Sequence, residues 1–142
     1  MLKICFVCTG NTCRSVMAER LMKKALKERG IADIKVSSKG LKANGENIAE
    51  NAKIVLKKYK ASGANRKSVK LGRIDDKTLY IVMTENIKSQ VKTSCIMSIK
   101  DLTGSDVSDP YGGDVELYQT TANQIIQAIE ILLEKILKWR DL

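Results

Sequence analysis

A cysteine and an arginine near the amino terminus are spaced so that they could bind and attack a phosphate group. Five small or polar residues lie between Cys8 and Arg14: Thr9, Gly10, Asn11, Thr12 and Cys13. The backbone N–H groups of such a loop, at the start of a helix, form a concavity for a phosphate-like dianion. A guanidinium can bind two of its oxygens at once. The same positive surroundings favour thiolate over thiol, so we expect Cys8 to be a nucleophile near neutral pH.

Three further positions would shape this loop. Gly10 and Asn11 tolerate left-handed backbone geometry, which a loop with inward-facing amides requires. Asn11 could also brace the loop through its side-chain amide. Ser15 could donate a hydrogen bond to the thiolate, cap the following helix, or do both.

Phosphate transfer also needs an acid for the leaving group, and Asp109 is the candidate. It precedes Pro110, the only proline of the chain, which favours an extended backbone at Asp109. An ordinary turn is the alternative interpretation of Asp-Pro, and from these residues alone it is the better supported one. Asp106 and Asp114 are nearby carboxylates that we rank below Asp109.

The loop and its surroundings resemble the low-molecular-weight protein tyrosine phosphatases. The resemblance rests on C-x5-R-S after a short apolar strand, on the following Met17-Ala18-Glu19, and on the total length. It implies a protein phosphatase that works through a cysteinyl-phosphate, with Cys8 as nucleophile, Arg14 as phosphate ligand and Asp109 as general acid. It also implies that Ser38 supports the loop by hydrogen bonding. No cofactor or metal is expected, because Arg14 and the loop amides supply the positive field.

The resemblance also bears on the substrate. Thr12 stands where tyrosine-specific members usually carry a branched aliphatic residue, and the loop resembles that of the protein arginine phosphatases in the family. The run Asp109-Pro110-Tyr111-Gly112-Gly113 resembles the same branch, and we expect Thr12 and Tyr111 to line the substrate pocket. Thr84 stands where tyrosine-specific relatives often have an aspartate. The prediction is therefore phosphoarginine, with phosphotyrosine as the alternative.

Two other functions fit the loop less well. Arsenate reductases of the same fold need a pair of resolving thiols, and Cys95 is the only cysteine downstream of the loop. A non-catalytic phosphate-binding module would need neither the thiol nor the acid. Cys13 is near enough in sequence to Cys8 for a reversible, inactivating disulfide, and simple space-filling is its alternative role.

Composition indicates one ordinary globular domain over residues 1–142. Apolar residues make up 44% and charged residues 29%, and no apolar run is long enough to span a bilayer. Without a leader pattern, we expect a monomeric, cytoplasmic protein that does not bind membranes. Its expected partners are phosphorylated proteins, with inorganic phosphate or a similar oxyanion in the active site.

The net charge of +9 admits two interpretations. One is binding of nucleic acid, but aromatic residues are only 4% of the chain, too few for base-stacking platforms. The other is a basic surface that attracts acidic substrates, and this is the interpretation we adopt.

The cysteines could in principle form a zinc site, because Cys5 and Cys8 have a C-x-x-C spacing and Cys13 and Cys95 would complete four thiolates. Against this, Cys5 lies in an apolar run, where a buried structural thiol is usual. Histidine is absent, which excludes a mixed site. A metal site is therefore not predicted.

The elements that must position these residues alternate between strand and helix patterns. Strands are predicted at 2–7, 33–38, 79–84 and 95–99, and helices at 15–29, 48–59, 85–91 and from 116 onward. Residues 101–115 are predicted to form a loop, and 60–76 remain unassigned. This order predicts a small central parallel sheet of about four strands with helices on both faces. The Cys8 loop would follow the first strand, at its carboxyl end, where such sheets bind ligands.

The last predicted helix has a clear apolar stripe, which begins at Leu117 and ends at Leu137. This stripe predicts the face that packs on the sheet. Trp139 is expected to anchor the end of the helix, with an interaction surface as the alternative.

Overall fold

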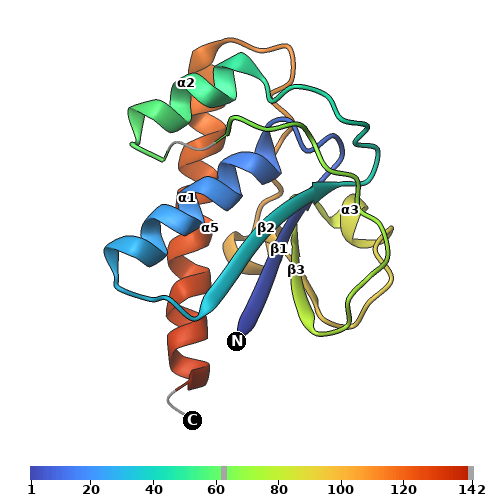
Figure 1. Cartoon of the computed structure of the whole chain (residues 1–142), viewed down its shortest axis with the longest axis vertical. Helices are drawn as coiled ribbons and strands as arrows, with labels where there is room; N and C mark the ends of the chain where they lie inside the picture. Colours follow the sequence, from blue (N-terminus) through green and yellow to red (C-terminus); the bar gives the residue numbers. More distant parts are fainter. Residues whose placement is uncertain (62–63, 141–142) are drawn as a thin grey trace.

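The chain forms a single-domain α/β fold around a parallel sheet, as the sequence predicts (Figure 1). The computed structural model describes residues 1–61 and 64–140. Its strands are β1 (Leu2–Cys8), β2 (Ile34–Gly40), β3 (Thr78–Val82) and β4 (Ile96–Ser98). Its helices are α1 (Arg14–Glu28), α2 (Glu50–Lys58), α3 (Glu85–Lys88), α4 (Ile99–Thr103) and α5 (Val115–Arg140).

The order of the strands, β2-β1-β3-β4, explains where a site can form. All three pairings are parallel, and β1 lies between β2 and β3. The chain moves from β1 to one side for β2, and later strands continue on the other side. The carboxyl end of β1 is therefore the switch point at which neighbouring connections diverge and leave a crevice.

The two faces of the sheet are covered unequally. Helices α1, α2 and α5 gather on one side, where Ile4 and Phe6 of β1 are buried (Figure 1). Side chains of successive residues on a strand point to opposite faces of the sheet. Tyr80 is paired with Cys5, the residue between Ile4 and Phe6, so Tyr80 points to the other face, and Ser98 points to the same face as Tyr80. There the Tyr80 hydroxyl accepts a hydrogen bond from the backbone of Asp75, and Ser98 donates to Glu85 at the start of α3. Helices thus occur on both sides, with one short helix and an irregular segment on the thinner side.

One helix lies where the sequence predicts the end of a strand and a loop. Helix α4 begins after Ser98, whose hydroxyl accepts from the backbone N–H of Asp101 while the Asp101 carboxylate accepts from the Ser98 N–H. This reciprocal capping box starts the helix, and Gly104 ends it at φ 89°. Five residues are too few to show a helical apolar period, so the pattern missed it.

The ends of α5 also differ from the prediction. Leu117 is 43% exposed, so it is not part of the buried stripe, and Trp139, predicted to anchor the end of the helix, is 50% exposed. The stripe itself begins at Tyr118 and includes Ile125, Leu132 and Ile136, all buried. Along residues 1–61 and 64–140, no helix is both long and apolar enough to cross a bilayer.

Gly40, the last residue of β2, touches the loop that follows β1. A Cβ atom on Gly40 would lie 2.8 Å from the backbone of Thr9, Gly10 and Asn11. Real Cβ atoms do not approach backbone this closely, so only glycine allows β2 to run beside the loop. The position of the loop therefore depends on the end of the neighbouring strand.

We expect Gly40→Ala to destabilise the protein by about 1–3 kcal/mol, the usual cost of overpacking a tightly fitted site. The measurement is the urea midpoint of unfolding, with circular dichroism to check the fold. Gly72→Ala is the matched control, because nothing lies within 4 Å of its added Cβ. Equal midpoints for the two variants would contradict the close packing of Gly40.

Candidate active site

The loop after β1 turns its carbonyl groups outward. The carbonyls of Cys8, Thr9 and Thr12 accept hydrogen bonds from Leu41, Lys42 and Ala49 at 2.8–3.0 Å. In a trans peptide unit the C=O and N–H point in opposite directions. The N–H groups that share those peptide units therefore face away from the neighbouring segment, toward the inside of the loop. Such inward N–H groups make a concavity for an anion.

Two donors meet the sulfur of Cys8. The backbone N–H of Asn11 donates to Cys8 Sγ at 3.2 Å, and the Ser15 hydroxyl lies 2.8 Å from the same atom. Asn11 takes a left-handed conformation with φ 55°, which turns its N–H toward the sulfur. Both contacts suit an anionic sulfur, because hydrogen bonds to a charged acceptor are the stronger ones.

The side-chain amide of Asn11 leaves Ser15 able to donate to an ionised Cys8 sulfur. The backbone N–H of Val69 donates to Asn11 Oδ1 at 2.9 Å, which identifies that atom as the amide oxygen. The amide nitrogen then donates to Ser15 at 2.8 Å and to Ser38 at 3.0 Å. Since the Ser15 oxygen already accepts from Asn11, its own proton is free to point at Cys8.

A buried charge network holds Asn11 from behind. Ser38 donates to the Glu19 carboxylate at 2.6 Å and accepts from Asn11 and from Arg66. These three hydrogen bonds use the one proton and both lone pairs of the Ser38 hydroxyl. Arg66 also donates to Asn11 Oδ1 at 3.1 Å and to Glu19 at 3.1 Å. Its guanidinium thus joins the loop, the end of β2 and helix α1.

Glu19 is ionised within this network. Burial raises the pKa of the Glu19 carboxyl, but the hydrogen bond from Ser38 and the charges of Lys23 and Arg66 outweigh it and hold that pKa below its usual range. Lys23 and Arg20 each lie 3.2 Å from its second oxygen. A carboxylate this well satisfied can remain charged although it is only 4% exposed.

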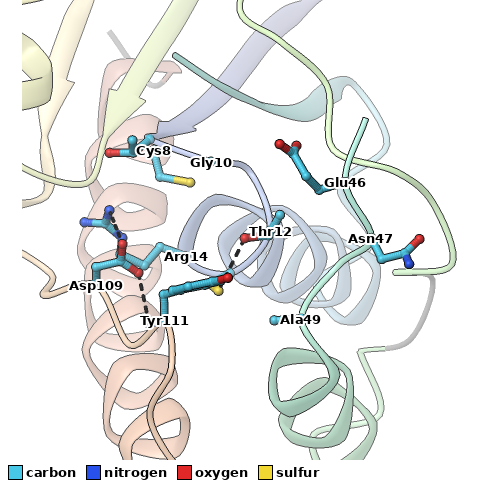
Figure 2. Close-up of a pocket in the computed structure, with 11 residues that line it drawn as sticks. Cys8, Gly10, Thr12, Arg14, Glu46, Asn47, Ala49, Asp109 and Tyr111 are labelled. Carbon is cyan, nitrogen blue, oxygen red and sulfur yellow. Dashed lines mark hydrogen bonds and ion pairs between the residues drawn. The ribbon is translucent and has the colours of Figure 1, made fainter. Parts of the chain in front are cut away.

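Arg14 is buried at the start of α1 and faces the loop that carries Asp109. Its guanidinium donates to the carbonyl of Val107 at 2.9 Å and lies 3.6 Å from the Asp109 carboxylate. Asp109 itself is half exposed and accepts from the backbone N–H of Tyr111 at 3.1 Å. Figure 2 shows Cys8, Arg14 and Asp109 on one side of a common cavity.

Cys13 has a different environment from Cys8. Its sulfur lies 3.2 Å from the hydroxyl of Tyr118 on α5 and 3.6 Å from that of Thr12. Burial raises the pKa of the Cys13 thiol, and these hydrogen bonds oppose the rise only in part. Burial and the contact with Cys13 also raise the pKa of the Tyr118 hydroxyl. Cys13 is thus held as a thiol and packs against the final helix.

The cavity has a volume of about 340 Å³ and two walls. One wall carries Asp109 and Tyr111, and the other carries Glu46, Asn47 and Ala49, which precede α2 (Figure 2). Its floor and sides include most of the loop: Cys8, Thr9, Gly10, Thr12, Cys13 and Arg14. In the part of the chain that the structure describes, no three acidic or thiol side chains are grouped so that they could hold a metal ion.

Several expectations for individual residues need correction. Gly10 does not take a positive φ; among non-glycine residues of the loop only Asn11 does. Ser15 lies inside α1 and does not cap it, because the cap position is Cys13 and no side chain caps there. Thr84, for which the sequence analysis gave no structural role, caps α3 by accepting from the backbone N–H of Ile87. The side-chain amide of Asn11 donates to Ser15 and Ser38, and the Ser15 hydroxyl lies within hydrogen-bond distance of Cys8 Sγ.

Sequence reasoning missed Arg66, Glu19 and the wall of residues 46–49. Glu19 lies in the recognised Met17–Glu19 run, and its spacing from Ser15 places both on one side of α1. Arg66 lies in the unassigned segment 60–76, which has no helix or strand period and includes residues 62–63, outside the described part. Nothing in that pattern singles out Arg66 among its many basic neighbours.

Comparisons with known proteins identify the family of this chain. Residues 3–141 match the sequence model of the family described as low molecular weight phosphotyrosine protein phosphatase. The chain belongs to this family, and it is a protein phosphatase. The family resemblance inferred from the Cys8 loop is therefore confirmed.

Individual relatives are named for two different phosphorylated residues, arginine and tyrosine. The protein-arginine-phosphatase of Geobacillus stearothermophilus is 34% identical, over 94% of this chain and 95% of that protein. The low molecular weight protein-tyrosine-phosphatase PtpA of Staphylococcus epidermidis is also 34% identical, over 91% and 94%. A solved structure, the YwlE arginine phosphatase from Geobacillus stearothermophilus, has a TM-score of 0.86 at 31% identity and covers 99% of this chain and 96% of its own.

We expect Arg66→Met to lower the free energy of unfolding by about 1–3 kcal/mol, because polar partners of Arg66 lose a charged donor. A carboxylate with a lowered pKa contributes stability above its unfolded pKa and loses it as the pH falls through the folded value. Arg66 lowers the pKa of Glu19, so its removal should move this acid loss of stability to higher pH. The measurement is the urea midpoint at several pH values between about 7 and about 3.

Arg73→Met is the matched control, because Arg73 is exposed and belongs to no ion pair within the described residues. An equal shift in the pH at which both variants lose stability in acid would contradict the role given to Arg66.

Proposed function

We propose that this phosphatase hydrolyses phosphorylated protein side chains through a cysteinyl-phosphate. The Cys8 thiolate attacks phosphorus in line, so that an S–P bond forms while the bond to the leaving atom breaks. Asp109 gives its proton to that leaving atom. Water then attacks phosphorus and passes a proton to Asp109, which breaks the S–P bond and restores the thiolate with release of inorganic phosphate.

The arrangement of donors around Cys8 supports this mechanism. The loop N–H groups and Arg14 would bind the equatorial oxygens, where charge is present throughout the transfer. The Arg14 guanidinium lies 3.6 Å from the Asp109 carboxylate. The general acid would therefore lie beside the phosphate that Arg14 binds, without a tight ion pair between the two side chains. Phosphorylated proteins are thus the proposed substrates, and phosphate the proposed occupant of the loop.

Phosphoarginine is the substrate that we propose, and Thr12 in the cavity wall carries this proposal. Its hydroxyl makes only a long, 3.6 Å contact with Cys13, so an oxygen lone pair remains for an N–H of a substrate guanidinium. The carboxylates of Asp109 and Glu46 lie in opposite walls and would attract a cationic group. Overall identity does not decide the matter, because arginine and tyrosine phosphatases are equally similar to this chain.

Phosphotyrosine is the second candidate, because of Tyr111. Its side chain lines the cavity and is 76% exposed, so its ring could stack on the ring of a substrate. The monomeric state and the cytoplasmic location remain predictions from the sequence.

We expect Cys8→Ser to abolish hydrolysis of an aryl phosphate, since the serine hydroxyl is a far weaker nucleophile at neutral pH. Asp109→Asn should lower kcat by about 10²–10⁴-fold, the usual contribution of a general acid. Steady-state kinetics with para-nitrophenyl phosphate give both values. Cys95→Ser is the matched control, because Cys95 lies outside the cavity. Wild-type activity in Cys8→Ser would rule out the thiol mechanism.

Thr12→Ile should change the preference between substrates. Loss of a hydrogen bond to a charged group costs about 1.5–3 kcal/mol, so the ratio of kcat/KM for phosphoarginine over phosphotyrosine peptides should fall at least about 10-fold. The control is Thr120→Ile, which makes the same change at an exposed site on α5. An unchanged ratio in Thr12→Ile would show that Thr12 does not select the substrate.

A further inference from the structure

The positive charge of this protein is concentrated in one stretch of chain. Residues 34–74 contain eleven Lys or Arg and two Glu, which equals the whole net charge of +9. The rest of the chain holds fourteen residues of each sign. The basic residues of the stretch are Lys35, Lys39, Lys42, Lys53, Lys57, Lys58, Lys60, Arg66, Lys67, Lys70 and Arg73.

Three of these lysines lie beside the cavity, and we call them the basic rim: Lys42, Lys67 and Lys70. The backbone N–H of Lys42 donates to the carbonyl of Thr9 in the phosphate loop at 2.8 Å. Lys70 is bridged to Gly40, which itself touches that loop. Lys67 is bridged to Asn47, a residue of the cavity wall, and its ammonium group donates to the Asn47 side chain.

The charge of the basic rim is not neutralised locally. Lys42, Lys67 and Lys70 are exposed. Within the described residues, none of the three takes part in an ion pair. Arg66 of the same stretch is paired with Glu19, so it belongs to the support of the loop and not to this surface.

The opposite wall of the cavity belongs to an acidic segment, residues 101–116, which we call the acidic wall. Residues 101–116 include five acidic residues and no Lys or Arg: Asp101, Asp106, Asp109, Asp114 and Glu116. Asp109 and Tyr111 of this segment face the wall of residues 46–49 across the cavity (Figure 2). A phosphorylated residue in the loop would therefore sit between the acidic wall and the basic rim, beside which Glu46 contributes one negative charge.

We propose that the basic rim binds an acidic segment of the protein substrate next to its phosphorylated residue. The proposal rests on the phosphatase function proposed above. Carboxylates that flank the phosphorylated residue would lie within about 10 Å of the rim, the range over which exposed charges interact at moderate salt. The acidic wall would repel the same segment, so the cavity also fixes the direction in which the substrate lies.

An acidic protein segment fits this surface better than a nucleic acid. Nucleic-acid grooves combine lysines with aromatic side chains on which bases stack. The exposed aromatic residues are Tyr111 and Trp139, and neither belongs to the basic stretch. The rim adjoins the phosphate loop, where a side chain of a protein substrate must enter.

The test compares peptides that carry one central phosphorylated residue, flanked by glutamate, glutamine or lysine. Phosphoarginine and phosphotyrosine versions are both used. We expect kcat/KM for the glutamate peptide to exceed that for the glutamine peptide by about 10-fold at low salt, as for a few exposed ion pairs acting together. High salt should reduce this ratio toward one, because it screens exposed charges.

Lys42→Gln/Lys67→Gln/Lys70→Gln should remove most of the preference. The control is Lys77→Gln/Lys135→Gln/Lys138→Gln, which lowers the net charge equally at exposed sites. These control sites lie next to the amino end of β3 and near the end of α5, away from the loop (Figure 1). A retained preference in the control together with its loss in the rim variant would support the proposal.

Other outcomes would overturn the proposal in distinguishable ways. Equal rates for all peptides would show that the basic rim does not bind the substrate, whereas the proposed phosphatase function would stand. Loss of preference in both triple variants would assign the effect to net charge alone. No preference, but inhibition by a single-stranded oligonucleotide that the rim variant lacks, would assign the surface to nucleic acid. Hydrolysis of none of the peptides would refute the proposed substrates as well.

Discussion

The site depends on the orientation of one side-chain amide, that of Asn11. Its oxygen must face the N–H of Val69, so its nitrogen must face Ser15 and Ser38. Reversal would set two N–H donors against each other on one side and leave the hydroxyls without a donor on the other. Because this amide is fully buried, such unpaired groups would have no water to replace the lost partners. Groups that lie far from Ser15 in sequence thus position its hydroxyl, 2.8 Å from the sulfur, where it can donate to a thiolate.

The two arginines of the site have different roles, which follow from their burial and their hydrogen-bond partners. Arg66 uses both terminal nitrogens on protein acceptors, among them a buried carboxylate, and is therefore a structural cation. Arg14 is more deeply buried, yet within the described residues its partners are one carbonyl and a carboxylate at 3.6 Å. A guanidinium has five N–H donors, so Arg14 keeps donors for an anion that enters the loop. Both residues carry the same charge, so the difference between their roles comes from the acceptors that they contact.

The parts of this structure that are local in sequence could be predicted, and those that depend on distant contacts could not. Strand β1, its loop and helix α1 form one continuous unit whose apolar run, glycine and arginine are all visible in the sequence. The parallel sheet follows from the alternation of strand and helix patterns. The role of Arg66 depends on how an aperiodic segment crosses to Asn11, and no local pattern encodes that path. The short helix α4 was hidden because its start is set by a capping box rather than by an apolar stripe.

The division between loop and walls explains why family membership does not decide the substrate. In the proposed mechanism the loop would bind phosphate mainly through backbone N–H groups, which every phosphorylated substrate would use equally. Discrimination would then come from the side chains beyond the phosphate, which in this cavity are Thr12, Glu46, Asn47, Ala49, Asp109 and Tyr111. Four of these six are polar or charged, whereas Ala49 and the ring of Tyr111 offer apolar surface. The proposed preference for phosphoarginine therefore rests on the polar groups, because buried polar groups need polar partners, and Ala49 and Tyr111 are the residues that would suit an aromatic ring.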